Sequence, residues 1–176
     1  MKRYHFISNY LLSSGKYLIA LMLFFISINN INAQQKEETL HQLNELLINT
    51  VMDDLFTPPV ASRIYVYPNI AFYECIYRED TAFKSLTGKL TDLHSLPNPP
   101  VNTPVDYFIS ACFSFSFVAQ SLVGTEDKII NWRKEFVATI RTKTDSLILI
   151  NSLKYGRTIA DLIIAWAKKD NYIESK

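Results

Sequence analysis

The sequence has 176 residues, of which 48% are apolar, 13% aromatic and 20% charged. This length and apolar content suit one compact globular domain and exclude a disordered chain, which lacks the apolar side chains that a core requires. Only four glycines and two cysteines occur, which excludes collagen and a disulfide-rich scaffold. The formal net charge of +1 gives no field that attracts nucleic acid, so no nucleic-acid partner is expected.

Residues 1–33 have the order of a secretory signal peptide. Three basic residues and no acidic one accompany an apolar run over residues 17–28, and a polar stretch then ends at Ala33. We predict cleavage between Ala33 and Gln34, and therefore a periplasmic or secreted protein. The apolar run covers about 18 Å as a helix, short of the roughly 30 Å of a hydrocarbon core. An uncleaved membrane tether is the alternative; after cleavage we expect no stable membrane span.

Residues 34–176 form the predicted mature domain. The first 33 residues hold three of the 18 basic side chains and none of the 17 acidic ones, so the mature chain carries a small negative charge. Cys75 and Cys112 remain in it, and an exported protein is free to form a disulfide bond. Each cysteine also lies in an apolar helical pattern, where buried thiols are common. Both interpretations stay open.

The first predicted helix runs from residue 38 to residue 55, because its leucines and valine recur every three or four positions. Asp53 and Asp54 lie near its carboxyl end, where the helix dipole disfavours anions, so another contact must favour them there. The prolines that follow Thr57 end this helix and begin the next. Pro68 then predicts a kink or a break, because proline supplies no backbone N–H.

Residues 79–103 are predicted to form a loop, or a short helix with coil, and the prolines gather at its end, over residues 96–104. A surface loop between helices is favoured over a domain linker in so short a chain. Thr103 is the expected N-cap of a helix over residues 104–123 that ends at Gly124. No charged residue occurs from position 107 to position 125. Five serine and glutamine side chains argue against a membrane span there, since each would need a partner in lipid. A helix that is apolar nearly all round is expected at the centre of a bundle.

Two further helices are predicted. Thr125 is the expected cap of a helix over residues 126–142, and Thr144 or Asp145 caps a last helix that ends at residue 169. Gly156 lies inside the last helix and costs about 1 kcal/mol relative to alanine, unless a neighbouring helix needs the close approach. No strand pair or internal repeat is evident. The fold class expected is all-α, a bundle of about five helices after the signal peptide.

The sequence is poor in catalytic patterns. It has no G-x-S-x-G, no glycine-rich phosphate loop and no H-E-x-x-H. Neither His41 nor His94 has a second metal ligand at a suitable spacing. We therefore assign no catalytic, cofactor-binding or metal-binding residue to this chain.

Two stretches carry a family resemblance: VMDDLFTPPVASRIYVYPNIAFYE over residues 51–74, and the tail from KYGR at residue 154 to AWAKKDNY at residue 172. They resemble the amino-terminal helical region of exported vanadium-dependent haloperoxidase-like proteins of Bacteroidetes-type bacteria, within the type-2 phosphatidic acid phosphatase superfamily. The resemblance covers essentially the whole mature chain and consists of scaffold residues.

The resemblance implies a helical bundle whose catalytic half binds phosphate or vanadate through a lysine and two arginines, with one histidine as nucleophile or vanadium ligand and another as general acid or base. These residues come in three blocks: K-x6-R-P, P-S-G-H and S-R-x5-H-x3-D. None is complete here. Lys134 and Arg141 have the first spacing, but Thr142 replaces the proline; Ser62-Arg63 begins the third block, but Asn69 stands at the histidine position. Both partial matches are interpreted as coincidental.

Two functional hypotheses follow. The first is a truncated or split amino-terminal scaffold, inactive alone, whose oxyanion site lies in a missing carboxyl-terminal half that is a partner if it is encoded separately. Its complete form would be a phosphoric-ester hydrolase or a vanadate-dependent halide peroxidase. Under this hypothesis Asp54, Arg63, Tyr65 and Glu74 are the polar residues expected to support or flank the pocket, although an ordinary buried polar network would also explain them.

The alternative is a self-contained exported helical module that binds a protein or lipid partner through its aromatic-rich helix at residues 104–123. A long exposed apolar face would mark such a module.

Overall fold

The computed structural model of the protein describes residues 34–169, so the predicted signal peptide lies outside the described residues. Residues 34–39 belong to one unit, and residues 40–169 belong to a second, compact unit. The described residues are helical apart from a long loop and short turns, and contain no strand. The prediction of an all-α fold is therefore confirmed.

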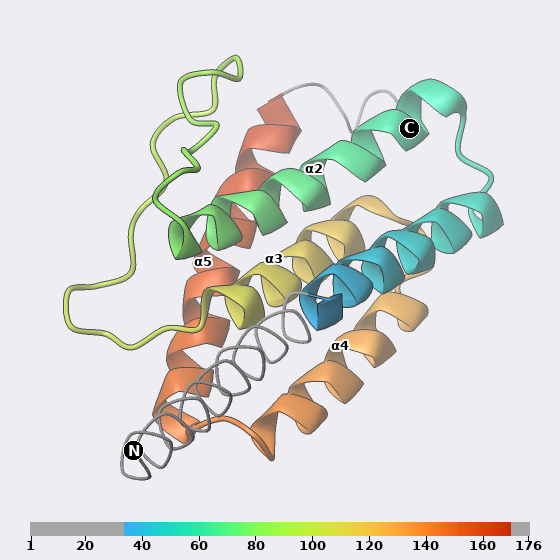
Figure 1. The fold of residues 1–176 in the computed structure, drawn as a ribbon. Coiled ribbons are helices and arrows are strands. Elements are labelled where there is room, and N and C mark those ends of the chain that lie inside the picture. The colour runs from blue at the N-terminus through green and yellow to red at the C-terminus, as the bar shows by residue number, and fades with distance from the viewer. Residues whose placement is uncertain (1–33, 170–176) are drawn as a thin grey trace, which may run out of the picture. The chain divides into compact units, whose positions relative to one another are not determined.

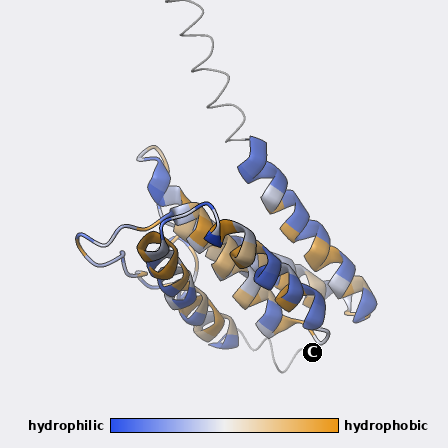
Figure 2. Ribbon diagram, turned by 90° about the horizontal axis from the view of Figure 1, so that it is seen from below, coloured by the Kyte–Doolittle hydropathy of each residue, from blue (hydrophilic) through white to orange (hydrophobic). Residues whose placement is uncertain are grey.

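Five α-helices follow one another along the described chain (Figure 1). The first ends at residue 53. After it come α2 (Pro58–Ile76), the short 3-10 helix η1 (Tyr77–Glu79), α3 (Tyr107–Leu122), α4 (Asp127–Arg141) and α5 (Ser146–Lys169). Hydrophobic and hydrophilic residues alternate along the helices (Figure 2), which is the pattern of helices that each bury one face.

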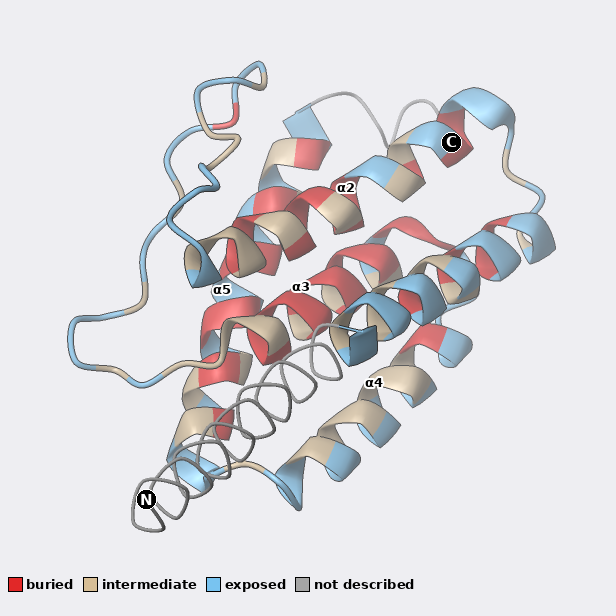
Figure 3. Ribbon diagram, viewed as in Figure 1, coloured by how far each residue is buried: buried red, intermediate tan, exposed pale blue. Residues whose placement is uncertain are grey.

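Helix α3 is the centre of the bundle. Ten of its 16 residues are buried, and it packs against both α2 and α5. Figure 3 shows this run of buried residues, and shows that α4 is mostly half-buried or exposed; Ile129 is its one buried residue. Among the described residues, no helix is both long enough and apolar enough to cross a bilayer. The uncharged stretch is thus explained by burial in protein, as predicted.

Helix α3 begins three residues later than the sequence indicated. The carboxylate of Asp106 accepts a hydrogen bond from the backbone N–H of Ile109 at 3.0 Å and caps the helix. Thr103 instead donates its backbone N–H to Pro100 in a turn of the preceding loop. The prediction of Thr103 as N-cap is wrong because two candidate caps lie within four residues, and the tertiary position of the loop selects the second.

Helix α4 begins at Asp127 without a side-chain cap, because the hydroxyl of Thr125, the predicted cap, donates to Asp54. For α5 the structure selects between the two predicted caps. Asp145 accepts hydrogen bonds from the backbone N–H groups of Leu147 and Ile148.

Helix α2 continues through Pro68, so of the two predicted outcomes, a kink or a break, the break does not occur. Ile64, Ala71 and Cys75, on both sides of the proline, are fully buried. An interior proline costs about 3 kcal/mol, and burial of this face on α3 offsets that cost. The packing therefore keeps the two halves of α2 in one helix.

Gly156 on α5 allows a neighbouring helix to approach closely, which is the role that the sequence left open. A Cβ atom built there would lie 2.5 Å from the backbone oxygen of Ser110 on α3, which is well inside van der Waals contact. The hydroxyl of Ser110 also donates to the backbone oxygen of Ser152 at 3.0 Å. Helices α3 and α5 thus approach closely enough that only glycine fits at this position.

Candidate functional site

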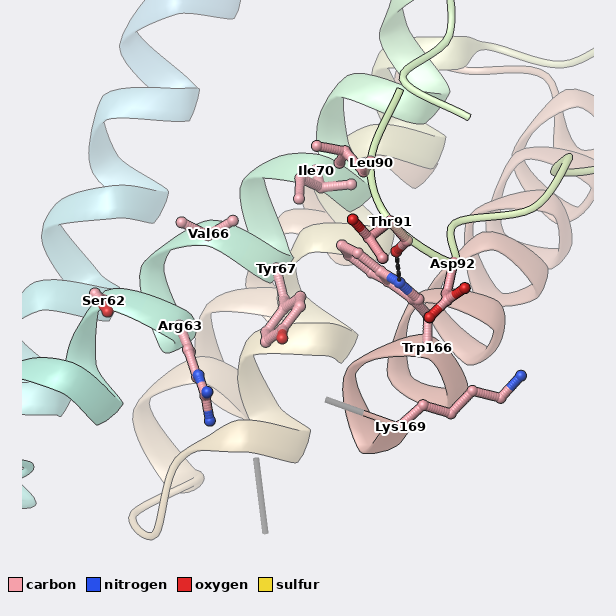
Figure 4. A pocket seen from close by; sticks show the side chains of 10 residues that line it. All are labelled: Ser62, Arg63, Val66, Tyr67, Ile70, Leu90, Thr91, Asp92, Trp166 and Lys169. Atoms are coloured by element: carbon pink, nitrogen blue, oxygen red, sulfur yellow. Dashed lines mark hydrogen bonds between the residues drawn. The ribbon is translucent and has the colours of Figure 1, made fainter. Parts of the chain in front are cut away.

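A pocket of about 370 Å³ lies between α2, the end of α5 and the loop at residues 90–92. Figure 4 shows its lining side chains. Its wall is mostly apolar, with Val66, Tyr67 and Ile70 from α2, Leu90 from the loop and Trp166 from α5. Pockets of this size with apolar walls are typical of small-molecule sites.

Two aromatic rings form the back of this pocket. The rings of Tyr67 and Trp166 meet edge to face, with centroids 5.2 Å apart. The indole N–H of Trp166 donates to the backbone oxygen of Thr91 at 3.0 Å (Figure 4). This bond satisfies the one polar group of a large side chain and joins α5 to the loop, so the ring has a fixed orientation.

The loop that closes the pocket is itself held in a defined conformation. Gly88 donates its backbone N–H to the oxygen of Leu93 at 3.0 Å, and Leu93 is buried. Both Gly88 and Asp92 have positive φ angles, of 73° and 58°. A non-glycine residue adopts this conformation only where its surroundings determine it. The pocket is thus largely preformed.

Glu74 anchors the same loop from beneath. Its carboxylate is fully buried and accepts hydrogen bonds from the backbone N–H of Leu86 at 2.6 Å and from the hydroxyl of Ser85 at 2.8 Å. Two donors to one carboxylate offset the desolvation that burial imposes.

Charged groups surround the mouth of the pocket. Arg63 comes from α2, Asp92 from the loop and Lys169 from the end of α5. Together they place two cations and one carboxylate beside an apolar wall. This arrangement can hold a small molecule by its flat apolar face, but it presents no nucleophile hydrogen-bonded to a base. Within residues 34–169, no group of three or more His, Cys, Asp and Glu side chains could hold a metal ion.

The four predicted support residues lie in different surroundings. Arg63 lines the pocket just described, and Glu74 holds its loop. Tyr65 lines a shallow apolar groove between the first helix and α2. Asp54 accepts three hydrogen bonds from Gly124 and Thr125 at the turn between α3 and α4. Their role beside a catalytic pocket stays a prediction. Sequence reasoning did not single out Trp166, Asp92 or Lys169 as pocket residues.

The two cysteines are both buried and form no disulfide bond. Of the two interpretations, the structure therefore has two buried thiols and not a Cys75–Cys112 bridge. Burial raises the pKa of the Cys75 thiol to about 12, although the nearby Arg78 opposes part of this change. Such a thiol is inert as a nucleophile, because the reactive species is the thiolate.

The two partial catalytic patterns do not come together in one catalytic site. Lys134 and Arg141 are exposed on α4. Asn69, at the position where the family has a histidine, donates its side-chain amide to Asn44 at 2.7 Å and to the backbone oxygen of Tyr65 at 2.8 Å. This amide pair joins α2 to the first helix. Asn69 therefore has a structural contact in place of a catalytic one.

The fold has a counterpart among solved structures. It matches the crystal structure described as the first bacterial vanadium-dependent iodoperoxidase, with a TM-score of 0.73 and 30% sequence identity over 78% of this chain. The chain has the vanadium haloperoxidase-like fold. The resemblance stated from residues 51–74 and from the tail is thereby confirmed at the level of structure.

The matched region is 33% of the iodoperoxidase chain, so the haloperoxidase-like chain spans about a third of that enzyme. No protein-family model matches the sequence, and no curated protein is significantly similar to it. The relationship is thus one of fold and moderate identity over part of a larger protein.

Proposed function

We propose that this chain is the helical scaffold part of an exported vanadium haloperoxidase-like protein, and that catalysis belongs to a polypeptide that carries the three family blocks. One observation carries the proposal. The similarity covers 78% of this chain and 33% of the iodoperoxidase, while the 176 residues contain none of the three blocks complete. These two facts support the inference that the matched part is scaffold.

The complete protein would hydrolyse phosphoric esters or oxidise halides with bound vanadate. Both reactions need clustered cations that stabilise negative charge on equatorial oxygens. The described residues do not form the family's catalytic site. No histidine is among the residues that line the hollow beside Lys134 and Arg141, and Asn69, at the histidine position of the third block, is bonded to Asn44. We therefore assign no step of the chemistry and no cofactor contact to this chain.

An exposed apolar stripe at the carboxyl end of the first helix supports the scaffold role. It consists of Ile48 and Met52, four residues apart on the helix, and Leu55 in the turn that follows, which is 87% exposed. Met52 and Leu55 also line the shallow groove that contains Tyr65. A row of large apolar side chains in water is unfavourable. We propose that the catalytic polypeptide packs over this stripe and covers it.

The second candidate is a self-contained interaction module for a protein or lipid partner. Helix α3, its predicted binding element, is at the centre of the bundle and offers no long exposed apolar face. The apolar stripe at the carboxyl end of the first helix is the surface that favours this candidate. Export itself is proposed from residues 1–33, and a secreted product that begins at Gln34 would support it.

Activity and gene context test the scaffold proposal. The purified protein should neither hydrolyse phosphate esters nor oxidise bromide or iodide with vanadate and peroxide. The P-S-G-H and S-R-x5-H-x3-D blocks should be found in the adjoining DNA, in any frame or in a neighbouring gene. Turnover by this chain alone, or unrelated sequence throughout that DNA, would contradict the proposal.

Co-expression with that catalytic polypeptide tests the stripe. Leu55 has a φ of 56°, a conformation that asparagine tolerates, so Leu55→Asn should fold normally. It should weaken co-purification and activity of the pair. The matched control is Leu147→Asn, at an exposed leucine on α5, which should leave both unchanged. Equal effects of the two variants would exclude the stripe as the docking surface and favour the second candidate.

A further inference from the structure

A second pocket, of about 360 Å³, lies between α3 and α4. Its floor is apolar, with Phe113 from α3 and Val137 and Ala138 from α4. Its remaining lining residues are the cations Arg133, Lys134 and Arg141, and no carboxylate lines it. The α4 residues recur at positions that share one face of a helix, so the three charges surround a single apolar hollow.

Arg133 is held in place by neutral groups. Its guanidinium lies 3.8 Å from the centre of the Phe117 ring and donates to the side-chain oxygen of Gln120. Its Nη1 atom is buried and has no hydrogen-bond partner. Arg157 lies 4.2 Å from the same ring, but it is paired with Asp161. Arg133 thus contributes positive charge that no ion pair in the described chain neutralises.

The electrostatic surroundings of Arg133 also favour a bound anion. Burial and the nearby Arg157 lower the pKa of Arg133, and Glu126 offsets only part of this effect. Among the described residues, Lys134 and Arg141 also have no carboxylate within ion-pair distance. An anion that enters the pocket would meet three cations, and its attraction to the half-buried Arg133 is screened less by solvent than its attraction to the exposed Lys134 and Arg141.

We propose that this pocket binds a small organic anion in which a phosphate or carboxylate group is joined to an aromatic or short aliphatic body. Lys134 and Arg141 bind the charged oxygens, since both are exposed at the rim and an arginine fork matches such groups. Arg133 adds its charge from beneath, and Phe113, Val137 and Ala138 contact the apolar body. This binding site is independent of the proposed scaffold role and involves no catalytic step.

Phenyl phosphate is a suitable probe, with calorimetric titration as the measurement. It combines both halves of the proposed ligand, whereas phenol and inorganic phosphate each carry one half. We expect saturable binding of phenyl phosphate at one site, and binding of each half weaker by about tenfold or more. Equal affinity for phenol, equal affinity for inorganic phosphate, or no saturable binding of phenyl phosphate would overturn the proposal.

Matched variants locate the site. The double variant Lys134→Gln, Arg141→Gln changes only exposed side chains and should weaken binding by about tenfold or more, while Lys154→Gln, at an exposed lysine of α5, should change it less than about twofold. Ala138→Leu should abolish binding because it fills the hollow; Ala165→Leu, on exposed α5 surface, should not. Circular dichroism verifies that each variant is folded. Equal losses in a variant and its control would overturn the assignment.

Discussion

Asp54 at the end of the first helix and Thr125 at the turn between α3 and α4 are joined by two hydrogen bonds. The hydroxyl of Thr125 donates to Oδ1 of Asp54 at 2.6 Å and its backbone N–H donates to Oδ2 at 3.1 Å, while Gly124 donates to Oδ2 at 2.7 Å. A carboxylate near a helix carboxyl end is otherwise unfavourable. These three donors explain why the sequence has an acid there.

This contact predicts that Asp54→Ala destabilises the protein by about 2 kcal/mol or more, because three donors lose a charged acceptor. Urea unfolding followed by circular dichroism gives the value. Asp53→Ala is the matched control. Asp53 pairs with Lys128 at an exposed position, so its loss should cost less than about 1 kcal/mol. Equal effects of the two variants would show that the turn does not depend on Asp54.

Removal of the buried carboxylate of Glu74 should release the loop that closes the first pocket. Glu74→Gln keeps the shape but replaces one acceptor oxygen with a donor facing Ser85 or Leu86. We expect a loss of about 2 kcal/mol, together with faster hydrogen exchange at the Leu86 amide. Glu45→Gln, at an exposed position of the first helix, should change neither. Unchanged exchange at Leu86 would show that other contacts hold the loop.

Gly156→Ala tests the close approach of α3 and α5. In an exposed helix this change stabilises by about 1 kcal/mol, but here the new Cβ meets the backbone of Ser110 at 2.5 Å. Overpacking costs about 1–3 kcal/mol or more, so we expect the midpoint of thermal unfolding to fall. Thr158→Ala, at a nearby exposed position, should leave it nearly unchanged. A stabilised Gly156→Ala protein would contradict the packing described.

Stability should decrease at alkaline pH because of Cys75. Burial raises the pKa of this thiol from 9.0 to about 12, so between these values the folded protein keeps a proton that the unfolded chain has lost. The contribution of Cys75 is complete below pH 9 and falls by about 1.4 kcal/mol per pH unit above it. Urea unfolding from pH 7 to pH 10.5 measures the slope.

Two variants identify the groups that cause this loss of stability at alkaline pH. Cys75→Ala should reduce the slope of the unfolding free energy against pH by about 1.4 kcal/mol per pH unit, which is the contribution of one proton. Burial also raises the pKa of Tyr155, so Tyr155→Phe should remove a separate contribution of the same sign that begins near pH 10. A slope that neither variant changes would show that other groups cause the alkaline loss.

The helices could be predicted because their signals are local. Apolar residues recur every three or four positions, prolines follow Thr57, and the uncharged stretch from residue 107 is too rich in serine for a membrane span. The errors lie at two helix starts and at Pro68, where no break occurs. Thr103 and Thr125 are both good caps by residue type, but one lies in a loop turn and the other is bonded to Asp54. Residue type alone does not choose between an N-cap and a tertiary contact.

The candidate site was less predictable. Arg63 and Glu74 were singled out from the sequence, whereas Asp92, Trp166 and Lys169 join them only through folding. The bond from Trp166 to Thr91 spans 75 residues, and no periodic pattern encodes such a pair. Likewise, Lys134 and Arg141 were dismissed as catalytic residues from the missing proline. That they border an apolar hollow depends on Phe113 of another helix.

The sequence by itself determined the fold class, the order of the five helices and the central place of the uncharged one, because helix periodicity and burial follow from residues near one another in the chain. Its resemblance to the haloperoxidase-like proteins also came from consecutive residues. The tertiary structure alone decided which donors Asp54 and Glu74 receive, that Cys75 and Cys112 are separate buried thiols, and where the two pockets lie. Each of these depends on side chains that are distant in sequence and meet only when the helices pack.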